Sequence, residues 1–494
     1  MNYSIETILK IFIDWEDKNN LEKIFVKKFP IWFLVREELF SALILKDNKF
    51  KMFTNKNTKK HSLYSLILCK NIFWGIFKSI YSSFKKNDSE ILAISYPCNR
   101  RRYNKGYYFD LYYDPIFDFK NSIKSYIFEL PLYNYEVMHY KNNWKNRRII
   151  FGDLFYLKEF FLTKLNCDCE QQIDIICNKY AELFLKYTGI LPDLEILRKK
   201  IYDRFQRNLK RINLFQNLLD HFSPKIIILT SGYTPSKRIL TQCAKKKGIK
   251  VIEFQHAHIY PSHIAYHYCP RWYGIKKYLP ISDKLLVFGE FYKEQLLFSE
   301  YWNDNDLIIV GNPFNYDCIN AGKNRPLVNM RKKFKYIILV ISQYPVINEI
   351  IKFLKGFHNY PEILFVIKTH PNYYIEEEKT YRNKLNIRGK NLMIVSQGNI
   401  FDYLFDCDVS IGIYSSGLID SISMDVPACV IDTKDNYKLL YNLVRKKFLR
   451  NVKSLDDFVR IVKSGYNKNH YHYNKKIYQN YSPQKVTSLI EKYL

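Results

Sequence analysis

Short apolar runs alternate with longer amphipathic stretches over most of the chain. The first series consists of "ILAIS" (91–95), "KIIILTSG" (225–232), "KVIEFQH" (250–256), "DKLLVFGE" (283–290) and "DLIIVGNP" (306–313). Each run is followed by small or polar residues, which is typical of a buried strand that ends in a turn. Helical patterns between the runs predict crossover units and therefore a parallel sheet.

A second series of the same kind follows a polar, basic stretch at 320–334. It consists of "KYIILVISQ" (335–343), "EILFVIKTHP" (362–371), "NLMIVSQ" (391–397), "DVSIGIYSSG" (408–417) and "VPACVIDT" (426–433). We place a domain boundary between residues 313 and 334. The pattern predicts two open α/β sheets, and ligands bind such sheets outside the carboxyl ends of the strands.

The remaining segments have mainly helical patterns. Residues 1–88 carry Trp15, Trp32 and many aliphatic residues at helical spacing, and residues 153–222 and the last sixty residues are also predicted to be mainly helical. The tyrosine-rich segment 106–119 is predicted to be a loop or turn. We therefore expect a helical region (1–88), a first α/β domain with a helical insertion (89–313) and a second α/β domain (314–494).

The charge of the chain indicates an anionic partner. Its 77 Lys and Arg against 48 Asp and Glu give a net charge of +29, which suits nucleic acid, an acidic membrane face or a phosphorylated substrate. The sequence has no zinc-finger spacing or RNA-binding signature, so the charge alone does not indicate nucleic acid. The ten cysteines form no CxxC pair, and the first residues turn acidic too early for a signal peptide, so we expect a cytoplasmic protein.

No apolar run is long enough to span a membrane. The nearest is 61–86, which Lys70 and Lys78 interrupt. This segment has two interpretations: an interfacial helix on an anionic membrane surface, or an amphipathic helix packed on its own domain.

Charged and polar residues follow one strand of the second domain. In "VIKTHPN", Lys368 and His370 come at the carboxyl end of the apolar run. A lysine there can act as a point charge and a histidine as a donor to phosphate. The alternative is that His370 only caps the strand.

A second strand of this domain ends in Ser415, Ser416 and Gly417, which form a tight turn into a short helix. The first turn of a helix offers N–H groups and a positive dipole end to an anion. The alternative is that one serine serves only as an N-cap.

Taken together, the His-Pro and Ser-Ser strand ends resemble the donor domain of bacterial glycosyltransferases of the GT-B fold. The likeness extends to sialic acid and Kdo transferases that use CMP-sugars and to CDP-glycerol glycerophosphotransferases. It implies two Rossmann-like domains facing a cleft, with a helical N-terminal region. It also implies that His370, Ser415 and Ser416 hold a CMP or CDP moiety, with Lys368, Gln343 and Gly417 as further nucleotide-binding candidates.

The segment "GIKVIEFQHAHIYPSHIAYHY" is similar to the N-terminal domain of capsule and surface-polysaccharide biosynthesis proteins. Those proteins often have Gln-His-Gly where this chain has Gln255, His256 and Ala257. The resemblance covers roughly residues 225–433. The acidic Asp/Glu-Asp/Glu-Gly motif of sialyltransferases is missing.

Four histidines in this segment raise the question of a metal site. His256, His258, His263 and His267 lack the partner Cys pair and the spacing of a structural zinc site, so we predict no metal there. His256 follows a strand end, where it could act as a catalytic base or orient the acceptor; a hydrogen-bonded loop histidine is the alternative.

Three carboxylates are further catalytic candidates. Asp110 and Asp114 lie in the tyrosine-rich segment, and Glu290 is expected to end a strand. Each could instead be a turn-forming or solvated acid.

These patterns predict a metal-independent glycosyltransferase that uses no cofactor besides its nucleotide-sugar donor. The donor is expected to be CMP-linked, and the acceptor a growing capsule, lipopolysaccharide or lipooligosaccharide glycan at the cytosolic membrane face. The alternatives are a CDP-linked polyol-phosphate transferase, a UDP-sugar 2-epimerase and, last, a basic nucleic-acid-binding protein. No nucleic-acid partner is expected.

Overall fold

The computed structural model describes residues 4–50, 88–96, 99–102, 108–120, 122–130, 149–155, 168–314, 325–370, 373–385, 390–433, 440–465 and 474–494. The chain forms two compact units. Unit 1 comprises Met1–Val287, Tyr292–Val310 and Ser482–Leu494, and unit 2 comprises Phe288–Phe291 and Gly311–Tyr481. The return of the last residues to unit 1 is a feature that the sequence-based division did not include.

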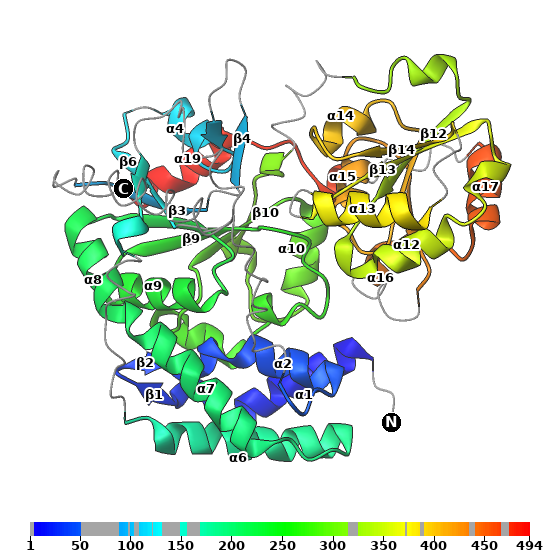
Figure 1. The fold of residues 1–494 in the computed structure, drawn as a ribbon. Coiled ribbons are helices and arrows are strands. Elements are labelled where there is room, and N and C mark those ends of the chain that lie inside the picture. The colour runs from blue at the N-terminus through cyan, green and yellow to red at the C-terminus, as the bar shows by residue number, and fades with distance from the viewer. Residues whose placement is uncertain are drawn as a thin grey trace. The chain divides into compact units, whose positions relative to one another are not determined.

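Unit 1 is built on a seven-stranded sheet in which every neighbouring pair is parallel (Figure 1). The strand order is β11-β10-β9-β8-β3-β6-β7. The strands are β3 (Ile91–Ser95), β6 (Ser125–Glu129), β7 (Ile149–Phe151), β8 (Ile226–Thr230), β9 (Lys250–Phe254), β10 (Lys284–Val287) and β11 (Leu307–Ile309).

Helices and two small hairpins complete this unit. The helices are α1 (Ile5–Lys18), α2 (Arg36–Leu45), α4 (Asp114–Phe119), α6 (Glu170–Thr188), α7 (Leu194–Leu209), α8 (Arg211–Phe222), α9 (Pro235–Lys246), most of α10 (Glu290–Leu297) and α19 (Pro483–Glu491). Three short helical turns that matter below are η1 (Leu21–Lys23), η6 (Ile264–Tyr266) and η7 (Pro270–Tyr278). The hairpins pair β1 (Phe25–Val26) with β2 (Phe29–Pro30), and β4 (Arg100–Arg102) with β5 (Tyr108–Asp110).

A buried ion pair joins the N-terminal helices to the histidine-rich segment. Arg36 Nε lies 2.8 Å from Glu16 Oε1, and both side chains are fully buried. The same guanidinium donates to the carbonyl oxygens of Ile264, at 2.7 Å, and His267, at 3.0 Å. Because a buried charge is costly unless it is fully paired, these contacts hold the N-terminal region and the segment after β9 in one arrangement.

Unit 2 is built on a six-stranded parallel sheet with the order β14-β13-β12-β15-β16-β17 (Figure 1). Its strands are β12 (Tyr336–Ile341), β13 (Ile363–Lys368), β14 (Leu392–Val395), β15 (Val409–Gly412), β16 (Ala428–Ile431) and β17 (Arg450–Val452). Its helices are α12 (Ile347–Phe353), α13 (Tyr374–Lys384), α14 (Ile400–Leu404), α15 (Gly417–Ser423), α16 (Tyr441–Arg445), α17 (Leu455–Lys463) and α18 (Asn474–Ile477). Mostly branched aliphatic residues are buried at successive positions of the central strands and so on both faces, as expected for a parallel sheet covered on both sides.

The two sheets share one strand order. In each, the first strand in the chain lies inside the sheet, the second and third strands lie on one side of it, and the fourth and later strands lie on the other. The order reverses between β3 and β8 in unit 1 and between β12 and β15 in unit 2. Such reversal points are where open α/β sheets bind ligands. The prediction of two Rossmann-like α/β sheets is thus confirmed.

Some sequence-based expectations differ from the structure. The segment 106–119 was expected to be a loop, but it contains β5 and α4. The short strands β6, β7 and β17 were not expected. Glu290, expected at a strand end, is the first residue of α10. The segment 61–86 lies outside the described residues. Among the residues that the structure describes, no helix is both long enough and apolar enough to cross a membrane.

Candidate functional site

The reversal point of unit 2 brings together the residues that follow β12 and β15. Gln343 lies two residues beyond the end of β12, and its side-chain Oε1 accepts the backbone N–H of Tyr414, at 3.3 Å. Tyr414 is the residue before the Ser-Ser pair that follows β15. Gln343 is therefore anchored to the serine-bearing loop, although the two are 71 residues apart in the sequence.

The two serines of this loop have different environments. Ser415 Oγ accepts the N–H of Gly417 at 3.2 Å, so its hydroxyl is engaged in the turn that begins α15. Ser416 is exposed and makes no capping hydrogen bond. A Cβ on Gly417 would lie 2.8 Å from Ile400 Cδ1 and 3.1 Å from Ile341 Cγ2. Glycine thus lets the start of α15 pack closely against the end of β12, and a larger residue would require the Ile400 and Ile341 side chains to shift.

A buried lysine lies at the end of the neighbouring strand. Lys368 is the last residue of β13, and its Nζ donates to the carbonyl oxygens of Thr369, at 3.2 Å, and Ser396, at 3.3 Å. Burial lowers the pKa of Lys368 to about 8, and the nearby carboxylate of Glu377 opposes this shift. The ammonium group is thus held by neutral carbonyls in a place where its charge is costly.

His370 and Glu377 meet at the same strand end. The backbone N–H of His370 donates to Glu377 Oε2, at 2.9 Å. Burial lowers the pKa of the His370 imidazole, and the charge of Lys368 adds to this effect. Burial raises the pKa of Glu377, while its hydrogen bonds with His370 and Ser342 act in the opposite direction. For Lys368, His370 and Glu377 alike, the protein environment disfavours the charged form.

A stacked pair of tyrosines lies beside these strand ends. The rings of Tyr344 and Tyr373 have centroids 5.2 Å apart and planes inclined by 14°. They are 43% and 44% exposed, and the Tyr373 ring also contacts that of His370, at 5.7 Å. Sequence reasoning missed both tyrosines and Glu377. The positions of the two tyrosines in the sequence were the signal that could have identified them, because Tyr344 directly follows Gln343 and Tyr373 comes three residues after His370.

In unit 1, the predicted carboxylates Asp110 and Asp114 are linked to each other and buried. Asp114 Oδ2 accepts the N–H of Asp110, at 2.7 Å. Asp110 Oδ1 accepts the N–H groups of Tyr112, at 3.0 Å, and Tyr113, at 3.2 Å, and Oδ2 accepts the hydroxyl of Ser95. These contacts are those of turn-forming carboxylates that fix the segment after β5 against the end of β3.

His256 follows β9 and is half-buried. Its Nδ1 and its carbonyl oxygen each lie 3.5 Å from the hydroxyl of Tyr112. Since Tyr112 is itself held by Asp110, the structure connects His256 to the Asp110 turn. Glu290 is not part of this group, because it belongs to the Phe288–Phe291 segment of unit 2.

The other histidines of the segment are packed against neighbouring rings and carbonyl groups. His258 Nδ1 lies 3.1 Å from the Tyr292 hydroxyl, and the His263 ring stacks on Tyr260 with a centroid distance of 4.6 Å. Burial lowers the pKa of His263 to about 3 and that of His267 to about 4. Within the described ranges, no three His, Cys, Asp or Glu side chains are grouped so that they could hold a metal ion.

A buried acid near the reversal point of unit 1 was also missed from the sequence. Glu253, in β9, accepts the N–H of Gly232 at 2.7 Å and the hydroxyls of Tyr266 at 3.2 Å and Ser282 at 2.7 Å. A Cβ on Gly232 would collide with the carboxylate of Glu253. Burial raises the pKa of Glu253, and these donors oppose the shift. Glu253 therefore joins the loops that follow β8 and η7.

No protein-family model matches the sequence, and no curated protein sequence matches it. Among solved structures, the chain is similar to a UDP-GlcNAc 2-epimerase from Neisseria meningitidis bound to UDP-GlcNAc. The two sequences are 13% identical, the match covers 82% of this chain and 98% of that chain, and the TM-score is 0.46. It is similar to a UDP-GlcNAc 2-epimerase from Methanocaldococcus jannaschii in complex with UDP-GlcNAc and UDP (14% identity, 81% and 99% coverage, TM-score 0.45). It is also similar to the glycotransferase of kitacinnamycin (10% identity, 83% and 100% coverage, TM-score 0.45).

Proposed function

We propose that the protein is a metal-independent glycosyltransferase of the GT-B type. In this proposal it transfers a sugar from a CMP-linked donor to a growing cell-surface glycan, and unit 2 binds the donor nucleotide. The observation that supports the proposal is the meeting of Gln343 with the Ser415–Ser416 loop at the reversal point, next to Lys368 and His370. These are residues suited to phosphate at the place where such sheets bind ligands.

The spacing of these groups suits an extended anion. β13, β12 and β15 are consecutive neighbours, and adjacent strands lie about 4.8 Å apart, so their ends span about 10 Å. Lys368 would supply charge, and Gln343 and Ser416 would supply neutral donors. An anion bound here would also relieve the cost of the buried ammonium of Lys368.

The stacked pair Tyr344 and Tyr373 would contact the nucleobase. Exposed aromatic faces beside a phosphate site stack on bases of any sequence, because every base has a π-face. This contact adds affinity, and we expect it to contribute little to the choice between cytosine and uracil.

For the transfer step we propose His256 as the base. It would take the proton of the acceptor hydroxyl as that oxygen attacks the anomeric carbon and the nucleotide phosphate leaves. Asp110 and Asp114 would act through position, by holding Tyr112 beside His256. Glu290 remains a prediction without a contact that supports a catalytic role.

A thermal-shift panel with CMP, CDP, UDP and GDP tests the donor site. A ligand at one hundred times its Kd stabilises the folded state by about 2.7 kcal/mol. We expect CMP and CDP to raise the melting temperature and the Ser415→Ala/Ser416→Ala variant to lose this response. The control Ser423→Ala, on the last residue of α15, should keep it.

The same panel separates the alternatives. Stabilisation by CDP together with turnover of CDP-glycerol would indicate a polyol-phosphate transferase. Stabilisation by UDP alone, with conversion of UDP-GlcNAc at C2, would indicate a 2-epimerase. An unchanged response of the double variant to CMP and CDP would refute the assignment of the serine loop.

His256→Ala tests the catalytic assignment. Loss of one general base costs roughly a hundredfold or more in turnover, whereas donor binding in unit 2 should stay intact. The matched control is His221→Ala, on α8 of the same unit. Full turnover in His256→Ala would move the search for the base to Asp110, Asp114 and Glu290.

A further inference from the structure

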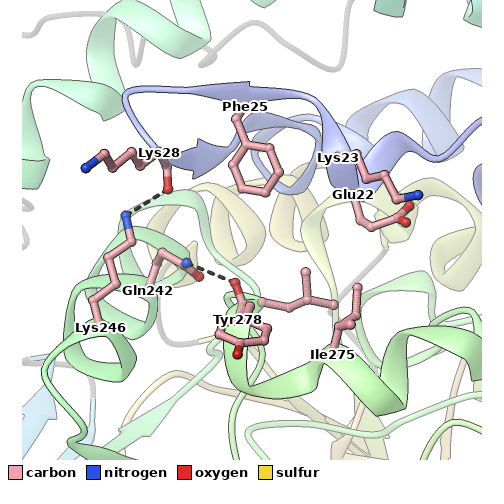
Figure 2. A pocket seen from close by; sticks show the side chains of 9 residues that line it. Glu22, Lys23, Phe25, Lys28, Gln242, Lys246, Ile275 and Tyr278 are labelled. Atoms are coloured by element: carbon pink, nitrogen blue, oxygen red, sulfur yellow. Dashed lines mark hydrogen bonds between the residues drawn. The ribbon is translucent and has the colours of Figure 1, made fainter.

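A separate pocket of about 380 Å³ lies in unit 1 (Figure 2). It is formed by the β1–β2 hairpin on one side and by the last turns of α9 and η7 on the other. α9 runs from the carboxyl end of β8 back to the amino end of β9, so Gln242 and Lys246 lie toward the amino ends of the strands. The pocket is therefore distinct from the strand-end residues described above.

Apolar side chains form the interior of this pocket. They are Phe25, Ile275, Tyr278 and Leu279. Phe25, on the hairpin, is 45% exposed, and Tyr278, at the end of η7, is 60% exposed. Figure 2 shows the Phe25 ring extending from the hairpin toward the segment that carries Tyr278. Two exposed aromatic rings therefore lie at one hollow of the surface.

Lysines surround the apolar interior. Lys23, Lys28 and Lys246 line the pocket, and Lys27 adjoins it at the hairpin tip. In the part of the chain that the structure describes, no carboxylate forms an ion pair with any of these four lysines. Glu22 also lines the pocket, and its carboxylate pairs with Arg271 at 3.1 Å.

Two of these lysines are held close together. Lys246 Nζ donates to the carbonyl oxygen of Lys28, at 2.7 Å, as drawn in Figure 2. This bond fastens the hairpin to α9, and neither ammonium group has a counterion among the described residues. Burial lowers the pKa of Lys246, and the charge of Lys28 lowers it further. An anion at this rim would be attracted by both.

The hairpin tip keeps two lysines where its backbone disfavours them. Val26 pairs with Phe29, so Lys27 and Lys28 are the two central residues of the turn. Both have positive φ, 50° and 61°, which is the signature of a type I′ turn. Asn-Gly is the favoured pair in such turns, and other residues pay about 1–2 kcal/mol each for this conformation.

We propose that this surface, the hairpin pocket (Phe25, Tyr278, Lys23, Lys27, Lys28 and Lys246), binds the anionic phospholipids of a membrane surface. The lysines would contact the lipid phosphates, and the rings of Phe25 and Tyr278 would enter the headgroup region. An apolar hollow with a cationic rim matches an amphiphile with an anionic head. The inference depends neither on sugar transfer nor on residues 61–86.

Vesicle flotation with the full chain tests the proposal, with phosphatidylcholine vesicles made with and without phosphatidylglycerol. The informative variant is Lys27→Asn/Lys28→Gly, which removes two charges and installs the pair that the turn prefers. We expect binding to the anionic vesicles to fall roughly thirtyfold, at about 1 kcal/mol per lysine. The melting temperature should stay the same or rise, so the loss cannot come from unfolding.

A second variant and a control complete the design. Phe25→Ser/Tyr278→Ser should weaken binding to the same vesicles without changing the net charge. Lys332→Gln/Lys333→Gln, on an exposed lysine pair of unit 2, removes the same charge and should leave flotation unchanged.

Three results would overturn the proposal. The Asn-Gly variant would bind anionic vesicles as tightly as the wild type, or the wild type would bind neutral and anionic vesicles equally. The third result is a protein that binds a DNA oligonucleotide but does not bind vesicles. The nucleotide-induced thermal shift should persist in the Asn-Gly variant, so failure here is distinguishable from failure of the proposed donor site.

Discussion

The two sheets have the same strand order but opposite chemistry at their reversal points. In unit 1, the carboxylates at the reversal point are engaged by donors of the protein. Glu253 accepts three hydrogen bonds, and Asp110 and Asp114 accept hydrogen bonds from backbone N–H groups. In unit 2, Lys368 is bound only by neutral carbonyls, and Glu377 Oε1 is buried without a hydrogen-bond partner among the described residues.

This difference distinguishes polar groups with a structural role from polar groups that are available to bind a ligand. A buried carboxylate that accepts three hydrogen bonds stabilises the groups around it and has little remaining capacity to bind a ligand. A buried ammonium held by carbonyls is costly in the free protein and gains when an anion arrives. Topology marks both reversal points equally, and each holds a buried lysine that donates to a carbonyl oxygen, Lys368 in unit 2 and Lys237 in unit 1. The two points differ in their carboxylates, and this difference favours unit 2 as the donor site.

The largest effect is expected from the acid of unit 1. Glu253→Ala leaves the donors of Gly232, Tyr266 and Ser282 without an acceptor, which should cost unit 1 about 3–5 kcal/mol of unfolding free energy. The four tryptophans that the structure describes, Trp15, Trp32, Trp272 and Trp302, fall in unit 1. Their fluorescence in a urea titration therefore reports the unfolding of this unit.

The matched variant in unit 2 is Glu377→Ala, which leaves one backbone donor, the N–H of His370, without its acceptor and should cost about 1–3 kcal/mol, less than Glu253→Ala. Equal costs for the two variants, measured by circular dichroism, would contradict the contrast between the units.

The second-largest effect is expected on nucleotide affinity when a buried lysine is replaced. Lys368→Met should weaken nucleotide binding roughly ten- to a hundredfold, because a hydrogen bond to a charged group contributes about 1.5–3 kcal/mol. Calorimetric titration with CMP or CDP measures it. Lys237→Met is the control, since Lys237 is buried at the reversal point of unit 1, where it donates to Thr230. It should destabilise unit 1 and leave nucleotide affinity intact.

Nucleotide affinity should also depend on pH with a definite sign. The pKa of Lys368 is lowered to about 8 in the free protein, so its ammonium is lost as the pH rises through that value. Above about pH 8, binding must first restore this proton, and affinity should fall by up to about tenfold per pH unit. Titrations in two buffers of different ionisation enthalpy count the proton taken up. A pH-independent affinity across this range would argue that Lys368 is not at the phosphate.

The smallest effect is expected from the aromatic pair. Tyr373→Ala removes one ring of the stack and should weaken CMP binding by about 1–1.5 kcal/mol, roughly five- to tenfold, with no effect on inorganic pyrophosphate. Tyr441, equally exposed on α16 at 44%, provides the control substitution. A loss of pyrophosphate affinity of the same size would show that the tyrosines support the phosphate loop rather than the base.

The sequence predicted the strands that are long and apolar, and with them the positions of Lys368, His370 and the serine loop. It missed β6, "SYIFE", and the three-residue β7, because mixed or very short runs carry little periodic signal. It also gave no sign of Glu253 as a buried acid. The donors to that carboxylate come from Gly232 and Ser282, 21 and 29 residues away, and only the folded sheet brings them together.

The two serines illustrate the same limit at the site. Their position after β15 follows from the pattern of the chain, but their different roles do not. Ser415 is engaged by the N–H of Gly417, and Ser416 is not, because the backbone angles of one turn decide which hydroxyl faces inward. Such angles depend on the packing of Gly417 against Ile341 and Ile400.

The return of α19 to unit 1 has a consequence for how the protein is made. α19 contacts α4, Glu491 pairs with Lys120, and Ser482 donates to Val310 at 2.8 Å. A ribosome delivers residues 482–494 only after all of unit 2 has been synthesised. Unit 1, although most of its chain is synthesised first, can therefore complete its surface only after the whole of unit 2 has been synthesised.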